Sequence, residues 1–264
     1  MFISIITDCQ DGNARVRQQT RYSVLFPNTA INFVGVSSDL EAAGNLIDVL
    51  DAARNEEGII AVNVAPRHGA AKKWPNGTPF GYFWYNKILI VCTIDGEVLS
   101  LMKKLGLGDH VNVTDIRTVL PVGGYEAAEV EFAAKSQFRS FDYLPRLARI
   151  VWDEHDVPSE KLNFTDIPTA TTGVWWIDSF GNCKTTLLQD DVHFENGAKR
   201  EISLHGVEIS ATCYNHLRDV PDGETGLILG SSGYAQNRFL ELVIQGQSAA
   251  KFYHITQKDT FAVV

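Results

Sequence analysis

Strand-like and helix-like patterns alternate along the first part of the chain. Phe2–Ile6 is a continuous apolar run, and Ala30–Val36 and Gly58–Val64 are further strand-like runs. Between the last two, apolar residues recur at helical spacing over Asp39–Ala53, and the polar segment Asp11–Val24 has a helical tendency. Continuous apolar runs suit strands buried on both faces, and this β-α-β-α-β alternation predicts a doubly wound α/β sheet.

From residue 173 onward the pattern changes to short strand-like runs separated by turns. These runs are Gly173–Ile177, Lys184–Gln189, Arg200–Leu204, Val207–Ser210, Gly226–Leu229, Phe239–Ile244 and Thr260–Val264. Regular short strands predict a small all-β barrel or sandwich. The preceding stretch contains Pro158 and Pro168 and shows little periodicity. We therefore predict an α/β domain over 1–158, a linker over 159–172 and a smaller all-β, barrel-like domain over 173–264.

Composition narrows the class of protein. Of the 264 residues, 45% are hydrophobic and 21% charged, which is ordinary for a soluble globular protein. No apolar run approaches the roughly 20 residues that span a bilayer, and no signal peptide precedes the first strand, so we expect a cytoplasmic protein without membrane association. A net charge of −9 argues against nucleic acid as a partner. The four scattered cysteines suit reduced thiols. The spacing Cys213-x-x-His216 could suggest a metal site, but the sequence has no second pair at ligand spacing, which favours a structural role.

Two acidic positions are candidates for ligand binding. Asp178 and Asn182 bracket a predicted hairpin turn, where a carboxylate and an amide can hold the ammonium and carboxylate of an amino acid. Alternatively, both side chains only bond their own turn. Asp8 follows the first predicted strand, at the edge of the sheet where ligands collect in open α/β folds. The alternative is that Asp8 caps the following helix.

Three segments together resemble one enzyme family. Gly173–Leu187 resembles the segment G-x-V-x-x-I-D-x-F-G-N-x-x-T-N of the S-adenosylmethionine hydroxide adenosyltransferase family, which also contains fluorinases and chlorinases. Ile3–Asp8 is similar to the family's opening strand, which ends in Thr-Asp. Gly230–Tyr234, Leu240–Leu242 and Gly246–Ala250 are similar to its C-terminal segment N-S-x-G-x-L-E-I-A…G-S-A. The matches occur in family order.

This resemblance implies a function and a set of site residues. In the family, a nucleophile attacks the ribose C5′ of S-adenosylmethionine and displaces methionine, with no cofactor and no metal. The implied ligand-binding residues are Asp8 for the ribose, Asn13 at a second Asp position, Asp178, Asn182 and Ser231 for the methionine head group, Phe180, and the backbone around Ile244 and Gly246 for adenine. Family sites lie between subunits, which implies a homotrimer.

The predicted nucleophile site departs from the family pattern. The family's catalytic Asp is Ala65 here, its Arg corresponds to Lys72 or Lys73, and its His aligns with Arg139. His68, Lys72 and Arg139 are therefore the candidate catalytic residues, with His68 as a general base. His68 is equally well explained as a solvated loop residue. The most direct hypothesis is a hydrolase that forms adenosine. The alternatives are a non-catalytic protein that binds S-adenosylmethionine or adenosine, and an enzyme that uses another nucleophile such as a halide.

Overall fold

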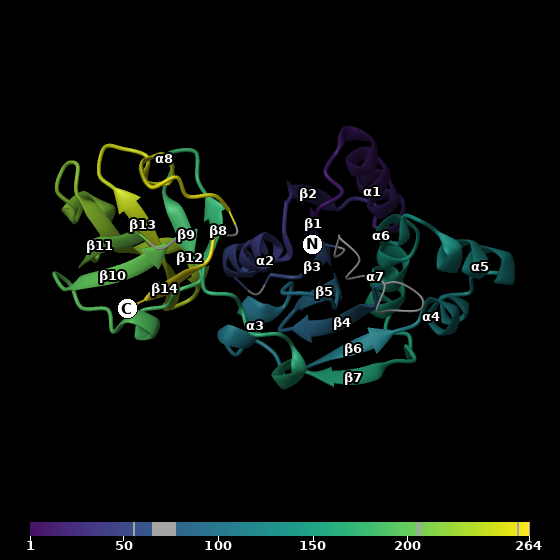
Figure 1. Ribbon diagram of the computed structural model, residues 1–264. Helices are drawn as coiled ribbons and strands as arrows, with labels where there is room; N and C mark the ends of the chain where they lie inside the picture. The colour runs from purple at the N-terminus through teal and green to yellow at the C-terminus, as the bar shows by residue number, and fades with distance from the viewer. Residues whose placement is uncertain (55, 65–77, 205–206, 258, 264) are drawn as a thin grey trace. The chain divides into compact units, whose positions relative to one another are not determined.

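The computed structural model describes residues 1–54, 56–64, 78–204, 207–257 and 259–263. The chain divides into two units, Met1–Thr169 and Ala170–Val264 (Figure 1). The division falls within the segment predicted as a linker. Each unit has its own sheet and its own hydrophobic core.

In the N-terminal unit, the described residues form a seven-stranded mixed sheet. Its strands are β1 (Phe2–Thr7), β2 (Ala30–Gly35), β3 (Gly58–Asn63), β4 (Phe80–Tyr85), β5 (Ile88–Thr93), β6 (His110–Thr114) and β7 (Glu160–Asn163). Their order is β2-β1-β3-β5-β4-β6-β7; the first four are parallel, and β4, β6 and β7 run antiparallel to their neighbours. Every residue of β3 and β5 is buried, as expected when helices cover both faces.

Helices lie on both faces of this sheet (Figure 1), which confirms the predicted doubly wound architecture. They are α1 (Gly12–Leu25), α2 (Asp39–Ala53), α3 (Ser100–Lys104), α4 (Ile116–Val122), α5 (Ala127–Lys135), α6 (Arg139–Asp142) and α7 (Leu144–Trp152). Helix α2 packs on β1 and β3, whereas α7 packs on β3 and β5 and α1 on β2. Tyr22, Phe26 and Leu147 are buried in one cluster with Ile5 and Leu89 of the strands. This packing fixes the strands whose ends carry the candidate site residues.

Strands β4, β6 and β7 lie outside the elements predicted from the sequence. Strand β4 is a largely aromatic run without regular alternation, and it forms a hairpin with β5 through a turn that holds Asn86 at a φ of 53°. Strand β7 pairs with β6 at the sheet edge, within the predicted linker. Three of its four residues are exposed, so no apolar pattern distinguished it from a loop. Residues 160–163 therefore belong to the sheet.

The described part of the C-terminal unit contains a second seven-stranded sheet. Its strands are β8 (Val174–Ile177), β9 (Cys183–Thr185), β10 (Lys199–Leu204), β11 (Val207–Tyr214), β12 (Thr225–Tyr234), β13 (Asn237–Ile244) and β14 (Phe261–Val263), in the order β14-β10-β11-β12-β13-β9-β8, and α8 (Ala249–Phe252) follows β13. Hydrogen bonds connect the two outer strands, β8 and β14, through the residues next to them. Val174 N of β8 donates to Asp259 O at 2.9 Å, and Phe261 N of β14 donates to Thr172 O at 3.1 Å. The sheet therefore curls until its edges meet, which confirms the barrel-like prediction and protects the edges.

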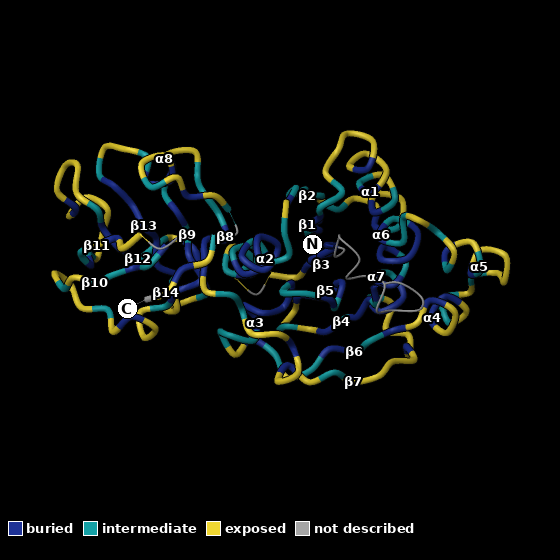
Figure 2. Tube along the Cα trace, viewed as in Figure 1, coloured by how far each residue is buried: buried dark blue, intermediate teal, exposed yellow. Residues whose placement is uncertain are grey.

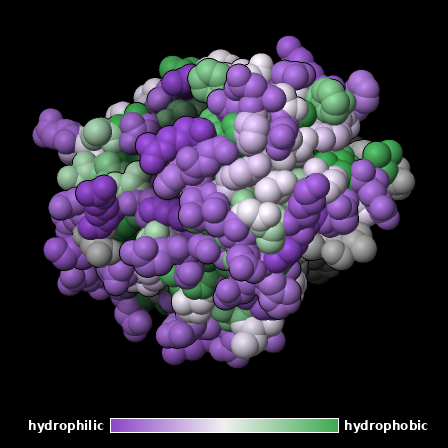
Figure 3. Space-filling model, turned by 90° about the vertical axis from the view of Figure 1, so that its left-hand side faces the viewer, coloured by the Kyte–Doolittle hydropathy of each residue, from purple (hydrophilic) through white to green (hydrophobic). Residues whose placement is uncertain are grey.

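Buried residues follow the strands of each unit, and exposed residues concentrate in the connections (Figure 2). The face drawn in Figure 3 is mostly hydrophilic, with apolar side chains in small groups. Among the described helices, none has the length and apolar character needed to cross a membrane. The four cysteines are free thiols, and burial raises the pKa of the Cys92 and Cys183 thiols to about 12, so neither ionises at neutral pH.

We predict that Tyr22→Phe stabilises the N-terminal unit. The Tyr22 hydroxyl is buried and, within the described residues, has no hydrogen-bond partner. Removing it should raise the free energy of unfolding by about 1 kcal/mol, measured as a higher urea midpoint. Tyr143→Phe is the matched control: its hydroxyl donates to Thr114 Oγ1 at 2.8 Å, so the same change should lower stability by about 1 kcal/mol. The opposite order of the two midpoints would contradict this account.

Candidate functional site

Polar side chains line the carboxyl edge of the N-terminal sheet. Asn63 Nδ2 donates to Thr7 Oγ1 at 3.2 Å, at the ends of β3 and β1. The Thr93 hydroxyl, at the end of β5, donates to Val64 O at 3.0 Å. Asp8 N donates to Asn63 O at 3.1 Å, so the Asp8 backbone continues the ladder past the end of β1. These bonds place Asp8 at the edge where ligands collect in open α/β sheets.

Asp8 does not cap the helix that follows it. Asp11 is the N-cap of α1, because its Oδ1 accepts hydrogen bonds from Asn13 N and Ala14 N, both at 3.0 Å. The Asp8 side chain is partly exposed, and Cys9 Sγ lies 3.5 Å from its Oδ1. Asn13 is the second residue of α1 and is exposed. The helix-cap explanation for Asp8 is therefore excluded, and its carboxylate remains a candidate ligand-binding group.

Of the three candidate catalytic residues, only Arg139 lies within the described residues; His68 and Lys72 lie outside them, as does Ala65. Arg139 opens α6, and its guanidinium sits 5.4 Å from the centre of the Phe80 ring. It lines a cavity of about 550 Å³ beside the ends of β4 and β6, shared with Thr114 and Asp115. Burial lowers the pKa of Arg139, yet an arginine stays protonated at neutral pH, so this group can hold an anion but cannot accept a proton.

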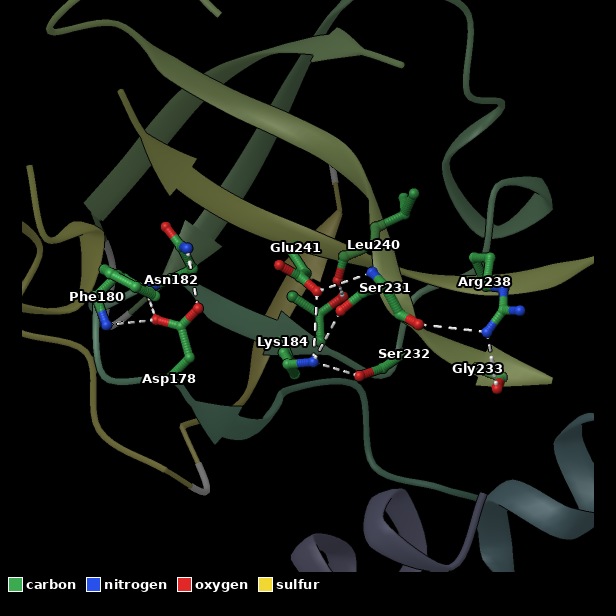
Figure 4. A network of polar contacts seen from close by, with 11 residues as sticks. Asp178, Phe180, Asn182, Lys184, Ser231, Ser232, Gly233, Arg238, Leu240 and Glu241 are labelled. Carbon is green, nitrogen blue, oxygen red and sulfur yellow. Dashed lines mark hydrogen bonds and ion pairs between the residues drawn. The ribbon is translucent and has the colours of Figure 1, made fainter. Parts of the chain in front are cut away.

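In the C-terminal unit, Asp178 and Asn182 form the tip of the β8–β9 hairpin (Figure 4). Asp178 Oδ1 accepts from Phe180 N at 2.8 Å and from Asn182 N at 2.9 Å, and Asp178 Oδ2 accepts from Asn182 Nδ2 at 3.0 Å. The two side chains therefore do bond their own turn. A carboxylate has about four acceptor positions, so three internal bonds leave capacity for a ligand donor. Phe180 is 77% exposed at the same tip.

The β8–β9 turn packs closely against the start of α8 at Gly181. Gly181 has a φ of 88°, and a Cβ at this position would collide with the Ser248 side chain. Its carbonyl accepts a hydrogen bond from Ala250 N at 3.0 Å. Only glycine combines this backbone conformation with this close approach, so the Phe180–Gly181–Asn182 sequence fixes the tip against the barrel.

A β-bulge in β12 brings Ser231 next to the hairpin strand β9. The β12–β13 register shifts between Leu229 and Gly233, which takes Ser231 and Ser232 out of the regular ladder. Lys184 Nζ, from β9, donates to Ser231 Oγ at 3.3 Å and to Ser232 Oγ at 2.5 Å, and lies 3.6 Å from Glu241 Oε1 of β13 (Figure 4). Sequence reasoning identified Ser231 but missed the other three residues, because their proximity depends on strand register.

The backbone proposed to meet adenine lies at the end of β13. The Ile244 side chain is buried in the barrel core, and its carbonyl accepts from Gln247 N at 3.2 Å. Gln245 exchanges backbone bonds with Gly223 and Glu224. Gly246 has a φ of 77°, and nothing lies within 4 Å of where its Cβ would stand, so the space beside it is open. The structure therefore leaves room for a ligand at Gly246, whereas the Ile244 side chain packs in the barrel core.

Across the described residues, no group of three or more His, Cys, Asp or Glu side chains lies close enough to hold an ion.

Comparisons with known proteins bear on both units. Residues 172–262 match the sequence profile of the SAM hydroxide adenosyltransferase C-terminal domain, where SAM is S-adenosylmethionine. An uncharacterized conserved protein from Thermotoga maritima has a similar structure, with a TM-score of 0.68 and 15% identity over 99% of both chains. A conserved hypothetical protein from Thermus thermophilus matches with a TM-score of 0.60 and 16% identity, again over 99% of both chains. At such identities these two likenesses show the fold alone. No curated protein matches the chain.

The profile match covers the hairpin, the bulge and the end of β13, which are the segments that carry the sequence motifs. The C-terminal unit is therefore similar to the C-terminal domain of the S-adenosylmethionine hydroxide adenosyltransferase family.

Proposed function

We propose that this protein binds S-adenosylmethionine and catalyses displacement of methionine from the ribose C5′, with water as the nucleophile and adenosine and methionine as products. The observation that carries the proposal is the profile match over 172–262, together with the polar surface formed by Asp178, Asn182 and Ser231 in that unit. The substrate brings its own leaving group, so no cofactor or metal is needed.

In the proposed reaction, the main task of the protein is to position the water and the substrate. Water attacks C5′, the C5′–S bond breaks, its electron pair stays on sulfur, and the water loses a proton. Because the sulfonium leaves as a neutral thioether, in-line alignment and exclusion of bulk water supply most of the acceleration. Asp8, at the carboxyl edge of its sheet, is proposed to accept hydrogen bonds from the two ribose hydroxyls. Asn13 and the exposed Phe180 ring are proposed to add contacts to the ligand.

The amino-acid half is assigned to the C-terminal unit. Asp178 and Asn182 are proposed to meet the ammonium, and Ser231 the carboxylate. Adenine is proposed to lie against the backbone at Gly246, where the space is open. His68 is proposed as the base, with Arg139 and Lys72 holding the nucleophile. Arg139 is supported by its place on a cavity wall at the ends of β4 and β6.

A binding protein without turnover is the second candidate. It is favoured by one observation: the groups that grip the ligand are present, whereas Ala65 and Arg139 occupy the family's Asp and His positions. The third candidate is an enzyme in which a halide, instead of water, displaces methionine from C5′.

The test is to incubate purified protein with S-adenosylmethionine, with and without chloride, and to identify the products by mass spectrometry. Adenosine with equimolar methionine supports the proposed hydrolase. A 5′-chloro-nucleoside assigns a halide as the nucleophile. Intact ligand that stays bound assigns the binding-protein function, and failure to bind at all rejects the proposal.

We infer that the active assembly is a homotrimer with sites between subunits, as the resemblance to the family implies. The residues proposed to bind the ribose and the amino acid, Asp8 and Asp178, lie in different units of the chain, which is compatible with a shared site. Light scattering at micromolar concentration should give three times the subunit mass of 29.2 kDa. A strictly monomeric species that still turns over substrate would reject the shared site.

Removing the turn residues should weaken ligand binding. Asp178→Ala and Asn182→Ala each delete a group proposed to meet the ammonium, so we expect S-adenosylmethionine to bind about 10- to 100-fold more weakly by calorimetry. Asp178→Ala should also lower the free energy of unfolding by about 1 kcal/mol, since its turn bonds are lost. Asp190→Ala is the charge-matched control on an exposed position of the same unit. Unchanged affinity in both turn variants would reject the assignment.

Turnover should depend on the protonation of His68. A general base works only when deprotonated, so the rate should rise with pH through about 6.5, the value of an unperturbed histidine. His68→Ala should abolish this rise and most activity while ligand affinity stays nearly constant. His155→Ala, at an exposed position, is the control and should leave the profile intact. A wild-type rate that is fast and flat from acid to neutral pH, and that is unchanged in His68→Ala, would show that His68 is not the base.

A further inference from the structure

Two phenylalanine rings at helix α6 lie outside the hydrophobic core of the N-terminal unit. Phe138 and Phe141 stack on each other, with their ring centres 5.5 Å apart and their planes at 27°. Both are only partly buried. Among the described residues, the core cluster includes their neighbours Tyr143 and Leu144 but neither of these rings. Another contact must therefore hold the rings in place.

Two arginines of α1 supply that contact, because α1 and α6 lie side by side (Figure 1). The Arg17 guanidinium lies 5.0 Å from the centre of the Phe138 ring and 4.5 Å from that of Phe141. The Arg21 guanidinium lies 4.3 Å from the centre of the Phe141 ring. Arg17 and Arg21 are one helical turn apart, so both reach the same ring. These four side chains, here called the α1–α6 stack, hold the two helices together by cation–π contacts.

Helix α6 depends on contacts with its neighbours because it is a single turn. It spans Arg139–Asp142, and a helix this short is not stable by itself. The Ser136 hydroxyl donates to the buried Asp142 carboxylate and accepts from Phe138 N at 2.9 Å, which closes the turn. Helix α7 follows directly and holds the end of α6. The α1–α6 stack holds its side.

The same turn places Arg139 on the wall of a cavity. Arg139 lies between Phe138 and Phe141 in the sequence, but its guanidinium is 5.4 Å from the centre of the Phe80 ring, beside the ends of β4 and β6. One side of α6 therefore contacts α1, and another presents the guanidinium that is proposed to hold the nucleophile. A shift of α6 would move that guanidinium.

Helix α1 also contacts the segment that carries Asp8. Gln18, next to Arg17 on α1, is buried, and its Nε2 donates to Cys9 O at 3.4 Å. Cys9 directly follows Asp8, whose carboxylate is proposed to bind the ribose. Adjacent residues of α1 therefore contact the segment of Asp8 and the turn of Arg139. The helix sets the distance between these two groups.

We propose that the α1–α6 stack is a positioning device for the chemical step: it fixes Arg139 relative to Asp8, so that the nucleophile lies in line with C5′ when Asp8 binds the ribose. The inference rests on the proposed function and adds Arg17, Arg21 and Phe141 as residues that act through Arg139. None of the three contacts the substrate in this arrangement. They therefore affect turnover and leave ligand affinity nearly constant, because in-line displacement is sensitive to misplacement of about 1 Å.

Adenosine formation at saturating S-adenosylmethionine tests the proposal in variants of the stack. Phe141→Leu keeps an apolar side chain but removes the ring, and kcat should fall about 5- to 30-fold. Arg17→Met should lower kcat less, by about 3- to 10-fold, because Arg21 still covers the ring. Phe141→Tyr keeps the ring and should stay within about twofold of wild type. Affinity for S-adenosylhomocysteine, a thioether that is not consumed, should change by less than about twofold in calorimetry.

Arg15→Met is the matched control. The Arg15 guanidinium lies 5.1 Å from the centre of the Phe33 ring, so it makes the same kind of contact with β2 instead of α6. This variant removes one positive charge from α1, as Arg17→Met does, and should keep the wild-type kcat. A fall in kcat equal to that of Arg17→Met would assign the effect to the charge of α1 and overturn the proposal.

Hydrogen exchange tests the hold on α6 without reference to activity. Tyr143 N donates to Arg139 O at 2.7 Å, and Asp142 N donates to Phe138 O at 3.0 Å. Both amides should exchange about 5- to 30-fold faster in Phe141→Leu, because the turn opens more often. Arg17→Met changes an exposed side chain and gives the same test if Phe141→Leu unfolds. Wild-type exchange rates in the folded variant would overturn the proposal.

A double-mutant cycle with Arg139→Ala separates positioning from a general structural role. If Phe141 acts through Arg139, Phe141→Leu should lower kcat in the wild-type background and have little further effect in the Arg139→Ala background. A structural role would lower kcat by the same factor in both. Equal factors, or a wild-type kcat in Arg139→Ala, would overturn the proposal while the proposed function stands. A wild-type protein that forms no adenosine would reject the proposed function, and this inference with it.

Discussion

The carboxylate of Asp178 is the interaction on which the polar surface of the C-terminal unit depends. It accepts hydrogen bonds from Phe180 N, Asn182 N and Asn182 Nδ2 at 2.8, 2.9 and 3.0 Å, and so closes the connection between β8 and β9. The closed turn sets the register of β9, with Cys183 in the barrel core and the partly buried Lys184 on the opposite face of the strand. A slip of one residue would exchange those two positions. One turn carboxylate therefore controls both the barrel core and the placement of its cation.

Sequence patterns predicted the parts of this protein that depend on local periodicity. The doubly wound sheet, helix α2 and the β8–β9 hairpin follow from apolar runs and turn residues. The cluster of Lys184 with Glu241 did not, because it requires the pairing of two strands far apart in the sequence. At the other sheet, the sequence left open whether Asp8 caps the following helix, and the structure assigns that cap to Asp11. Exposed edge strands such as β7 carry too little apolar pattern to be recognised.

The two halves of the proposed reaction differ in how much of the family pattern they retain. The C-terminal unit keeps the turn carboxylate, the glycine that seats it and the bulge serine, and it surrounds them with satisfied hydrogen bonds. The N-terminal unit keeps Asp8 but has Ala65 and Arg139 at the positions of the family's base and its partner. A sulfonium is a good leaving group, so its displacement needs positioning more than covalent catalysis by the protein. The proposed hydrolysis therefore needs a positioned water and a substitute base, and predicts slow turnover.

Isotope transfer from water tests the central claim most directly. The protein is incubated with S-adenosylmethionine in ¹⁸O-labelled water, and the nucleoside and amino-acid products are analysed by mass spectrometry. Displacement at C5′ by water predicts adenosine that carries one ¹⁸O atom at its 5′ position, together with unlabelled, intact methionine in equal amount. Formation of 5′-methylthioadenosine, or of adenosine without the label, would contradict the account, as would a bound substrate that is recovered unchanged.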